Sequence, residues 1–271
     1  ETHRGQGLTH RLIATAEAEA RARNLPCLKL ETRIELTENH AAFARLGFMK
    51  TAETAHPGYD RPTSITMIRM LGPPHLRYAG QDAATQRATL GAILRANPLI
   101  WRALREARAL ALPDWHIVAG ALYNTVWNSL TGRPSRHGIK DIDLFYFDSN
   151  DLSYEAEDQV IQRGATHFSN DGPPVEIRNQ ARVHLWYQAR FGHPIAPLRS
   201  CDDSIGRFAA LTHCVGVRLE ADGRLDIHAP YGLDPIFAFR LIPNPANASS
   251  GTYAEKAERN RANWPEITIE P

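Results

Sequence analysis

The chain has 271 residues, of which 43% are hydrophobic and 23% charged, and its formal net charge is +1. This composition is typical of a globular protein and gives no strong sign of nucleic-acid binding or of attraction to an anionic membrane. No apolar run approaches the ~20 residues of a membrane-spanning helix and no signal peptide is visible, so we expect a cytoplasmic location without a membrane partner. The oligomeric state stays open.

The three cysteines, Cys27, Cys201 and Cys214, are far apart and include no C-x-x-C pair. Their spacing therefore predicts neither a disulfide framework nor a zinc site. The chain begins with Glu1 rather than Met, which indicates a fragment of a longer protein.

Residues 1–72 are expected to form a unit of their own. Helical spacing of apolar residues predicts a helix over Leu8–Arg23, with Leu8, Leu12, Ile13, Ala16 and Ala20 facing a core. A strand is expected over Cys27–Thr32, then a short helix capped by Thr37 or Asn39 and ending at Leu46, and a further strand over Ser64–Leu71.

Arg4, Gly5 and Gly7 stand directly before the first predicted helix, where free backbone N–H groups favour an anion. The order of glycine loop, helix, strand, helix and strand resembles the C-terminal half of a GCN5-related N-acetyltransferase. The resemblance implies acetyl-CoA bound by Arg4, Gly5, Gly7 and Asn39. It also places Phe43 where the family often has a proton-donating Tyr. Because the first half of that fold is missing, we expect weak CoA binding and no acetyl transfer by these residues alone.

Residues 73–82 are predicted to be a proline-containing linker, and residues 83–271 a second domain. Two helices are expected to open that domain, over Ala83–Ala96 and Pro98–Leu110, because Pro is tolerated in a first helical turn.

The segment Trp115–Asp148 carries the strongest functional pattern. A short apolar strand ends at Gly120-Ala121, an amphipathic helix over Ala121–Leu130 is expected next, and a β-branched and aromatic strand then contains Asp141 and Asp143. Alternation along a strand puts these two carboxylates on one face, where their repulsion favours a bridging cation such as Mg²⁺. A tight turn at Gly120-Ala121 is suited to holding a phosphate.

A third carboxylate has two candidates, Glu176 and Asp226, which both lie between apolar residues of predicted strands. We prefer Glu176 because it is nearer in sequence. Arg178 and Arg182 follow it and are suited either to nucleotide phosphates or to pairing with nearby acids.

The remaining elements are expected to be a helix over Ser204–Thr212, a hairpin over Val215–Ile227 and a polar closing helix over Tyr253–Trp264. The basic side of the closing helix, which bears Lys256, Arg259 and Arg261, is either solvated or lines a phosphate pocket.

Gly120-Ala121 followed by Asp141-Ile142-Asp143 resembles the polymerase-β type of nucleotidyltransferase. More closely, residues 80–267 resemble a bacterial nucleotidyltransferase-like family long catalogued as a domain of unknown function. Besides the aspartates, the resemblance covers the run from Pro174 to Tyr187 and Ala229-Pro230-Tyr231-Gly232-Leu233. In the superfamily the glycine turn is usually Gly-Gly or Gly-Ser, so Ala121 removes a hydroxyl contact to phosphate.

The sequence therefore predicts an α/β (α+β) chain in which a partial acetyltransferase fold precedes a nucleotidyltransferase-like mixed sheet with flanking helices. The leading hypothesis is Mg²⁺-dependent transfer of a nucleotidyl group from an NTP to an unknown acceptor. Asp141, Asp143 and Glu176 would be catalytic and hold the metal, and Gly120, Ala121, Arg178 and Arg182 would bind the phosphates. The alternatives are acetyl-CoA-dependent N-acetyl transfer and a non-catalytic nucleotide-binding module.

Overall fold

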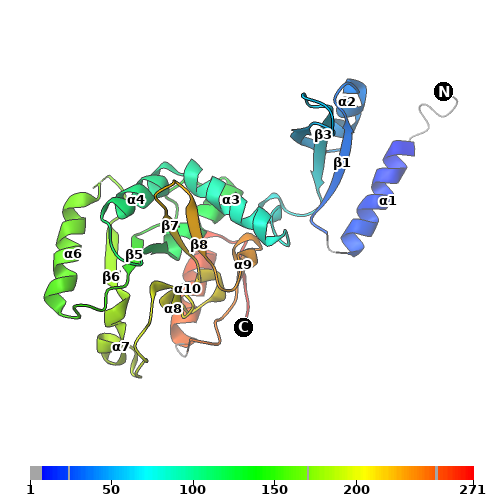
Figure 1. Cartoon of the computed structure of the whole chain (residues 1–271). Coiled ribbons are helices and arrows are strands. Elements are labelled where there is room, and N and C mark those ends of the chain that lie inside the picture. The colour runs from blue at the N-terminus through cyan, green and yellow to red at the C-terminus, as the bar shows by residue number, and fades with distance from the viewer. Residues whose placement is uncertain (1–7, 24, 170, 248–249) are drawn as a thin grey trace. The chain divides into compact units, whose positions relative to one another are not determined.

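The computed structural model describes residues 8–23, 25–169, 171–247 and 250–271. The chain divides into two compact units, residues 1–80 and residues 81–271. Figure 1 shows the helices and strands of each unit, which are described separately here.

The first unit is a small antiparallel sheet with the strand order β1-β3-β2. Its elements are α1 (Leu8–Ala22), β1 (Cys27–Arg33), α2 (Thr37–Arg45), β2 (Met49–Thr54), β3 (Ser64–Met70) and the 3-10 turn η1 (Pro74–Leu76). Phe48, Ile65 and Met67 form its buried core. The sequence did not predict β2, whose residues are exposed along its whole length.

Two expectations for the first unit are wrong in detail. Of the helix residues expected to face a core, Ala20 is buried but Leu8 and Leu12 are 45% and 70% exposed. A core of three residues covers only part of the apolar stripe of α1. In α2 the N-cap residue is Leu36, which makes no side-chain cap, rather than Thr37 or Asn39.

The second unit contains a five-stranded mixed sheet with the order β6-β5-β4-β7-β8. Its first elements are α3 (Ala83–Ala96), α4 (Pro98–Ala109), β4 (His116–Val118), α5 (Gly120–Thr131), β5 (Ile142–Tyr146), α6 (Tyr154–His167), β6 (Val175–Asn179), η2 (Gln180–Arg182) and α7 (Val183–Phe191). The remaining elements are α8 (Cys201–Ile205), η3 (Leu211–His213), β7 (Gly216–Leu219), β8 (Leu225–His228), α9 (Asp234–Phe237), β9 (Arg240–Leu241), α10 (Ser250–Asn263) and β10 (Thr268–Ile269). Strands β9 and β10 pair in parallel as a separate two-stranded sheet.

The two faces of the five-stranded sheet differ in character. Strand β5 alternates fully buried residues with less buried ones, so Leu144 lies on one face while Asp143 and Phe145 lie on the other. The register pairs Leu144 with Ile177 of β6 and Ile117 of β4, which makes the first face apolar.

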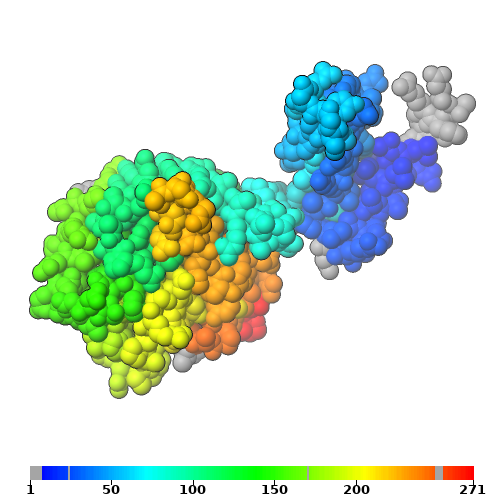
Figure 2. Space-filling view, viewed as in Figure 1, coloured from blue at the N-terminus to red at the C-terminus, as the bar shows by residue number. Residues whose placement is uncertain are grey.

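Helices cover the apolar face. Helix α6 approaches β6 so closely that a Cβ on Gly164 would lie 2.2 Å from Ile177 Cδ1, which only glycine avoids. Helix α3 lies against the β7–β8 hairpin, where Arg87 and Arg95 donate to the carbonyls of Ile227 and Gly223. Figure 2 shows this hairpin, in orange, against green segments from a much earlier part of the chain.

The predicted boundaries of α3 and α4 are confirmed to within one residue. Asp82 accepts a hydrogen bond from the Thr85 N–H and caps α3, and Asn97 accepts from the Leu99 N–H and caps α4. Pro98 occupies the first turn of α4, where its missing N–H costs nothing.

Two other expectations for the second unit are wrong. Helix α5 is buried along almost its whole length rather than amphipathic, with Trp127 fully enclosed and donating from Nε1 to the Ile236 carbonyl. The helix expected over Ser204–Thr212 is instead the end of the short α8, a bridge at Ala210 to Pro243, and η3. Bonds to the distant segment around Pro243 replace the helical ladder there.

Within the described part of the chain, no helix has both the length and the apolar character needed to cross a membrane.

Candidate active site

Asp143 and Glu176 lie side by side on the polar face of the large sheet. They are register partners on the parallel strands β5 and β6, so their side chains emerge on the same face. Both line a cavity of about 300 Å³, together with Phe145, Arg178 and Lys256. The Arg178 Nη2 atom lies 3.5 Å from the Glu176 Oε2 atom, and both side chains are about half exposed.

Asp141 directly precedes β5 and lines a second cavity of about 150 Å³, which Asp143 also lines. Helix α5 anchors the loop that leads to Asp141. Asn124 donates to the Gly138 carbonyl and Asn128 to the His137 carbonyl. The two aspartates predicted to share one face are therefore brought to one cavity, and Glu176 adjoins it through Asp143.

Asp143 carries the largest electrostatic perturbation among these carboxylates. Burial, and after it the neighbouring charges of Asp141 and Glu176, together raise its pKa from 3.8 to about 6. Among the described residues, neither the Asp141 nor the Asp143 side chain makes a hydrogen bond or an ion pair, although the charges of Lys256 and Arg178 oppose the rise in the Asp143 pKa. The carboxylates still repel one another, and a bound cation would relieve that repulsion.

Helix α10 supplies two cations to the cavities. Lys256 lines both cavities, and Arg259 lines the smaller one beside Asp141. Burial lowers the pKa of Lys256, while the charge of Asp143 acts in the opposite direction. Of the two options for the basic side of the closing helix, the structure supports lining of a pocket for Lys256 and Arg259. Arg261 instead pairs with Glu258 at 2.8 Å.

The β4–α5 junction forms another wall of the smaller cavity. Ala119 has a φ of 50° and so adopts a left-handed conformation that is strained for a residue with a Cβ. Ala119 and Gly120 line the cavity, whereas the Ala121 side chain is buried behind it. Helix α5 thus presents its first N–H groups at this junction, with backbone rather than side-chain donors.

Two aromatic rings close the smaller cavity. Tyr123 stacks on His213 with ring centroids 4.8 Å apart, and both residues line the cavity. Burial raises the pKa of Tyr123 to about 12 and lowers that of His213 to about 3, so both are neutral near pH 7. The basic side chains that line the smaller cavity are therefore Lys140, Lys256 and Arg259.

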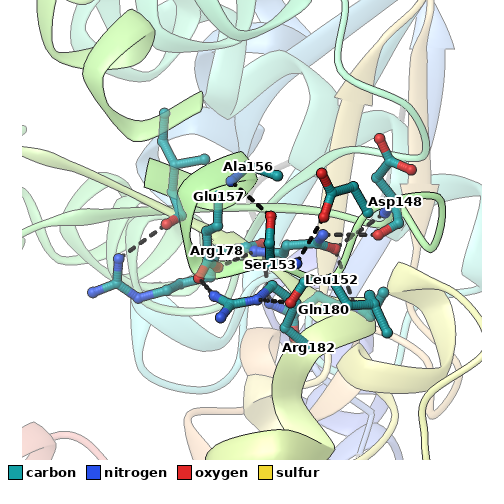
Figure 3. Close-up of polar contacts among 12 residues, drawn as sticks. Asp148, Leu152, Ser153, Ala156, Glu157, Arg178, Gln180 and Arg182 are labelled. Carbon is teal, nitrogen blue, oxygen red and sulfur yellow. Dashed lines mark hydrogen bonds and ion pairs between the residues drawn. The ribbon is translucent and has the colours of Figure 1, made fainter. Parts of the chain in front are cut away.

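Arg182 does not reach the carboxylates, although the sequence proposed it for phosphate binding. Its guanidinium pairs with Glu157 of α6 and donates from Nε to the Leu152 carbonyl at 3.0 Å, as Figure 3 shows. Both side chains of the pair are only 11% exposed. The other option stated for Arg182, pairing with a nearby acid, is the one that the structure contains.

Asp226 also lies apart from Asp143, because β4 and β7 separate its strand β8 from β5. Its carboxylate accepts from Arg218 at 3.1 Å. Of the two candidates for a third carboxylate, the structure brings only Glu176 to the aspartates.

The residues expected to bind CoA are only partly described. Arg4, Gly5 and Gly7 lie outside the described residues, and Asn39 is exposed on α2. Phe43 packs on the core with its ring in edge contact with Phe48 at 5.9 Å, while Tyr59 is 58% exposed.

The carboxylates fit a divalent metal. Asp141 and Asp143 offer hard oxygen donors to the smaller cavity, Glu176 offers another beside Asp143 in the larger one, and the half-buried Asp143 has no ion pair among the described residues. The cluster has no nitrogen or sulfur donor, which favours Mg²⁺ or Mn²⁺ over zinc.

Comparisons with known proteins identify the families that the two units resemble. A nucleotidyltransferase family model matches residues 105–269, and an acetyltransferase (GNAT) family model matches residues 1–48. A solved structure described as a CCA-adding enzyme head domain is 25% identical. That match covers 68% of this chain and 95% of the other, with a TM-score of 0.57.

A second solved structure, described as an acyl-CoA N-acyltransferase from Klebsiella pneumoniae subsp. pneumoniae MGH 78578, is 35% identical. That match covers 26% of this chain and 48% of the other, with a TM-score of 0.23, so the chain spans about half the length of that protein. No curated protein matches the chain. By the match over residues 105–269, which include Asp141, Asp143 and Glu176, the chain belongs to the nucleotidyltransferase family.

Proposed function

We propose that the second unit is a divalent-metal-dependent nucleotidyltransferase, which transfers a nucleotidyl group from an NTP to an acceptor. The observation that carries the proposal is the pairing of Asp143 with Glu176 across β5 and β6, with Asp141 at the same cavity. Three carboxylates that repel one another, without a cation paired to the aspartates, are a costly arrangement unless a metal ion binds them.

In this proposal Asp141, Asp143 and Glu176 hold Mg²⁺. The metal supplies Lewis-acid stabilisation of the charge that develops on the phosphoryl oxygens. The chain itself binds the triphosphate in the smaller cavity. There the N-terminus of α5 at Gly120 and the cations Lys256 and Arg259 oppose its negative charge.

The larger cavity is the proposed site of the acceptor, because its wall is apolar and aromatic. Phe145, Trp186, Tyr187 and Phe208 line it beside Asp143. A wall of this kind packs against a flat or apolar group, while Asp143 and Glu176 orient the attacking hydroxyl or amine at one end.

The test is turnover of α-labelled NTPs with Mg²⁺ or Mn²⁺ and a panel of acceptors: RNA, protein and small alcohols or amines. RNA belongs to the panel because the similar solved structure is described as a CCA-adding enzyme head domain. We expect pyrophosphate release by wild type, and loss of it in Asp141→Asn. Wild-type protein that binds no NTP with either metal would contradict the assignment. Metal-dependent NTP binding without turnover on any acceptor would favour the non-catalytic module.

The match of residues 1–48 to the acetyltransferase family supports a second candidate function, acetyl-CoA-dependent transfer by the first unit. We expect no such turnover by these residues alone, because Phe43 has no proton to donate. Turnover of acetyl-CoA with simple amines, clearly above a Gly7→Trp control, would overturn this expectation.

A further inference from the structure

A second cluster of possible metal ligands lies on the same polar face of the large sheet, at some distance along it from Asp143. Asp114 lies just before β4 and His116 begins that strand, while Cys201 and Asp202 come from α8 and His228 from the end of β8. Elements far apart in sequence thus converge at this place, which is independent of the proposed nucleotidyl transfer.

The side chains are close enough to share one ion. One ligand atom each from Asp114, His116 and Cys201 lies within 4.8 Å of the other two. The Asp202 carboxylate adjoins them, 3.9 Å from His116 Nε2 and 3.3 Å from His228 Nδ1.

The unsatisfied ring of His116 indicates that a ligand binds here. Its side chain is only 3% exposed, and neither ring nitrogen has a hydrogen-bond partner among the described residues. The buried Nε2 of His228 has none either. Buried polar atoms are nearly always satisfied, so a pair of unsatisfied nitrogens on one ring indicates a missing partner.

The cations nearby are already neutralised. Arg218, which faces the cluster from β7, pairs with Glu220 at 2.8 Å and with Asp226 at 3.1 Å. Asp114 also has a structural task, since its carboxylate accepts the Cys201 N–H at 2.8 Å. That bond uses one oxygen and leaves the other for an ion.

We propose that Asp114, His116, Cys201 and Asp202 form a site for a divalent transition-metal ion of the zinc class. Nitrogen, sulfur and carboxylate donors in a four-ligand set are the combination that zinc prefers. His228 orients the Asp202 carboxylate through its Nδ1.

On metal binding the Cys201 thiol loses its proton to solvent and the thiolate coordinates the ion. Without metal, the thiol donates to the Asp114 carbonyl at 2.7 Å, and coordination replaces that contact.

This site is separate from the carboxylate cluster in both place and chemistry. His116 is the register partner of Phe145, and an apolar cluster that includes Val118, Ile205 and Phe145 lies on this face. Asp141, Asp143 and Glu176 offer only oxygen, whereas the second site has a thiolate and an imidazole. An ion there would fasten α8 to β4.

The experiment uses the full chain, stripped with a chelator and titrated with Co²⁺ and then Zn²⁺. We expect one equivalent of Co²⁺ to give a thiolate-to-cobalt charge-transfer band in the near ultraviolet, which Zn²⁺ abolishes by displacement. Zn²⁺ should also raise the melting temperature. Cys201→Ser and His116→Gln should lose both effects, while Asp143→Asn should keep the band, because Asp143 offers no sulfur.

Cys214→Ser is the matched control, since Cys214 is equally buried but lies outside the cluster. No band in wild type would overturn the proposal, as would a band that survives in Cys201→Ser or disappears in a folded Cys214→Ser. If Cys201→Ser does not fold, Asp202→Asn decides. Its carboxylate is half exposed, and metal affinity that matches wild type would contradict the assigned ligand set.

Discussion

The large sheet carries two groups of acidic residues, one at each edge, and they differ in whether a basic side chain pairs with them. At the β7–β8 edge, Asp226 and Glu220 both pair with Arg218. At the β5–β6 edge, Asp143 has no ion pair among the described residues, and its pKa is raised to about 6 by burial and by Asp141 and Glu176. The first arrangement satisfies itself. In the second, neither aspartate has an ion pair among the described residues, and this difference separates a structural charge network from a candidate metal site.

Among the substitutions that test this difference, Asp143→Asn should have the largest effect. We expect loss of metal-dependent NTP binding and a fall in turnover on the order of 10²-fold or more, because a ligand that positions transition-state charge stabilisation is gone. The metal-free protein should be as stable as wild type or slightly more stable, since a repelled charge is removed. Calorimetric titration of MgATP, beside melting curves without metal, measures both effects.

Other roles for Asp143 predict different results from that experiment. A carboxylate that is merely solvated predicts little change in either property. One that is structurally hydrogen-bonded predicts a loss of ~1–3 kcal/mol in the unfolding free energy without metal.

Neutralising one carboxylate at each edge of the sheet tests the difference between the edges directly. Glu176→Gln should weaken metal-dependent NTP binding strongly. Asp226→Asn should leave that binding intact and cost only ~0.2–1 kcal/mol of stability, because its pair with Arg218 is partly exposed. Denaturant titration measures the change in stability of both variants, and calorimetric titration measures their NTP binding. Equal losses of binding in the two variants would remove the distinction between the edges.

Lys256 sharpens the comparison because it is a cation that lines both cavities beside Asp143. Lys256→Met should raise the pKa of Asp143 further and weaken NTP binding roughly tenfold, ~1.4 kcal/mol. Arg261→Met on the same helix is the control, since Arg261 pairs with Glu258. If both variants bind NTP like wild type, α10 does not contribute a phosphate contact.

The pH dependence of stability gives a smaller effect with a defined sign. The folded-state pKa of Asp143 is raised from 3.8 to about 6, so in this window the folded chain binds more protons than the unfolded chain. Metal-free wild type should therefore lose stability as pH rises from about 4 to about 6, relative to Asp143→Asn. Urea midpoints of both proteins across this range measure it. Parallel curves would mean that Asp143 titrates normally.

Removing residues 1–76 should have the smallest effect on the second unit. The chain divides between residues 80 and 81, and the large sheet with its covering helices lies wholly in the second unit. We expect a cooperative thermal transition that matches the second unit in the full chain. Loss of that transition on truncation would show that the two units share a core.

Features that depend only on neighbouring residues could be predicted from the sequence. Asp141 and Asp143 share a cavity because side chains alternate along a strand, a rule that needs only neighbouring residues. Asn97 and Pro98 set the start of α4 through a cap and a fixed φ, which are also local. The β7–β8 hairpin follows from turn residues between two short apolar runs.

Long-range features were decided only by the tertiary structure. The strand order places Glu176 beside Asp143, and it places Asp226 beyond β4 and β7. The spacing of apolar residues along the sequence does not reveal the order of strands in a sheet. Lys256 of α10 lines the cavity that holds Asp141 and Asp143, and His116 of β4 meets Cys201 of α8. The sequence determined which side chains share a strand face or a helix turn, because backbone geometry fixes those relations. Which strands and helices meet depends on how the whole apolar surface is buried, and that is a property of the complete fold.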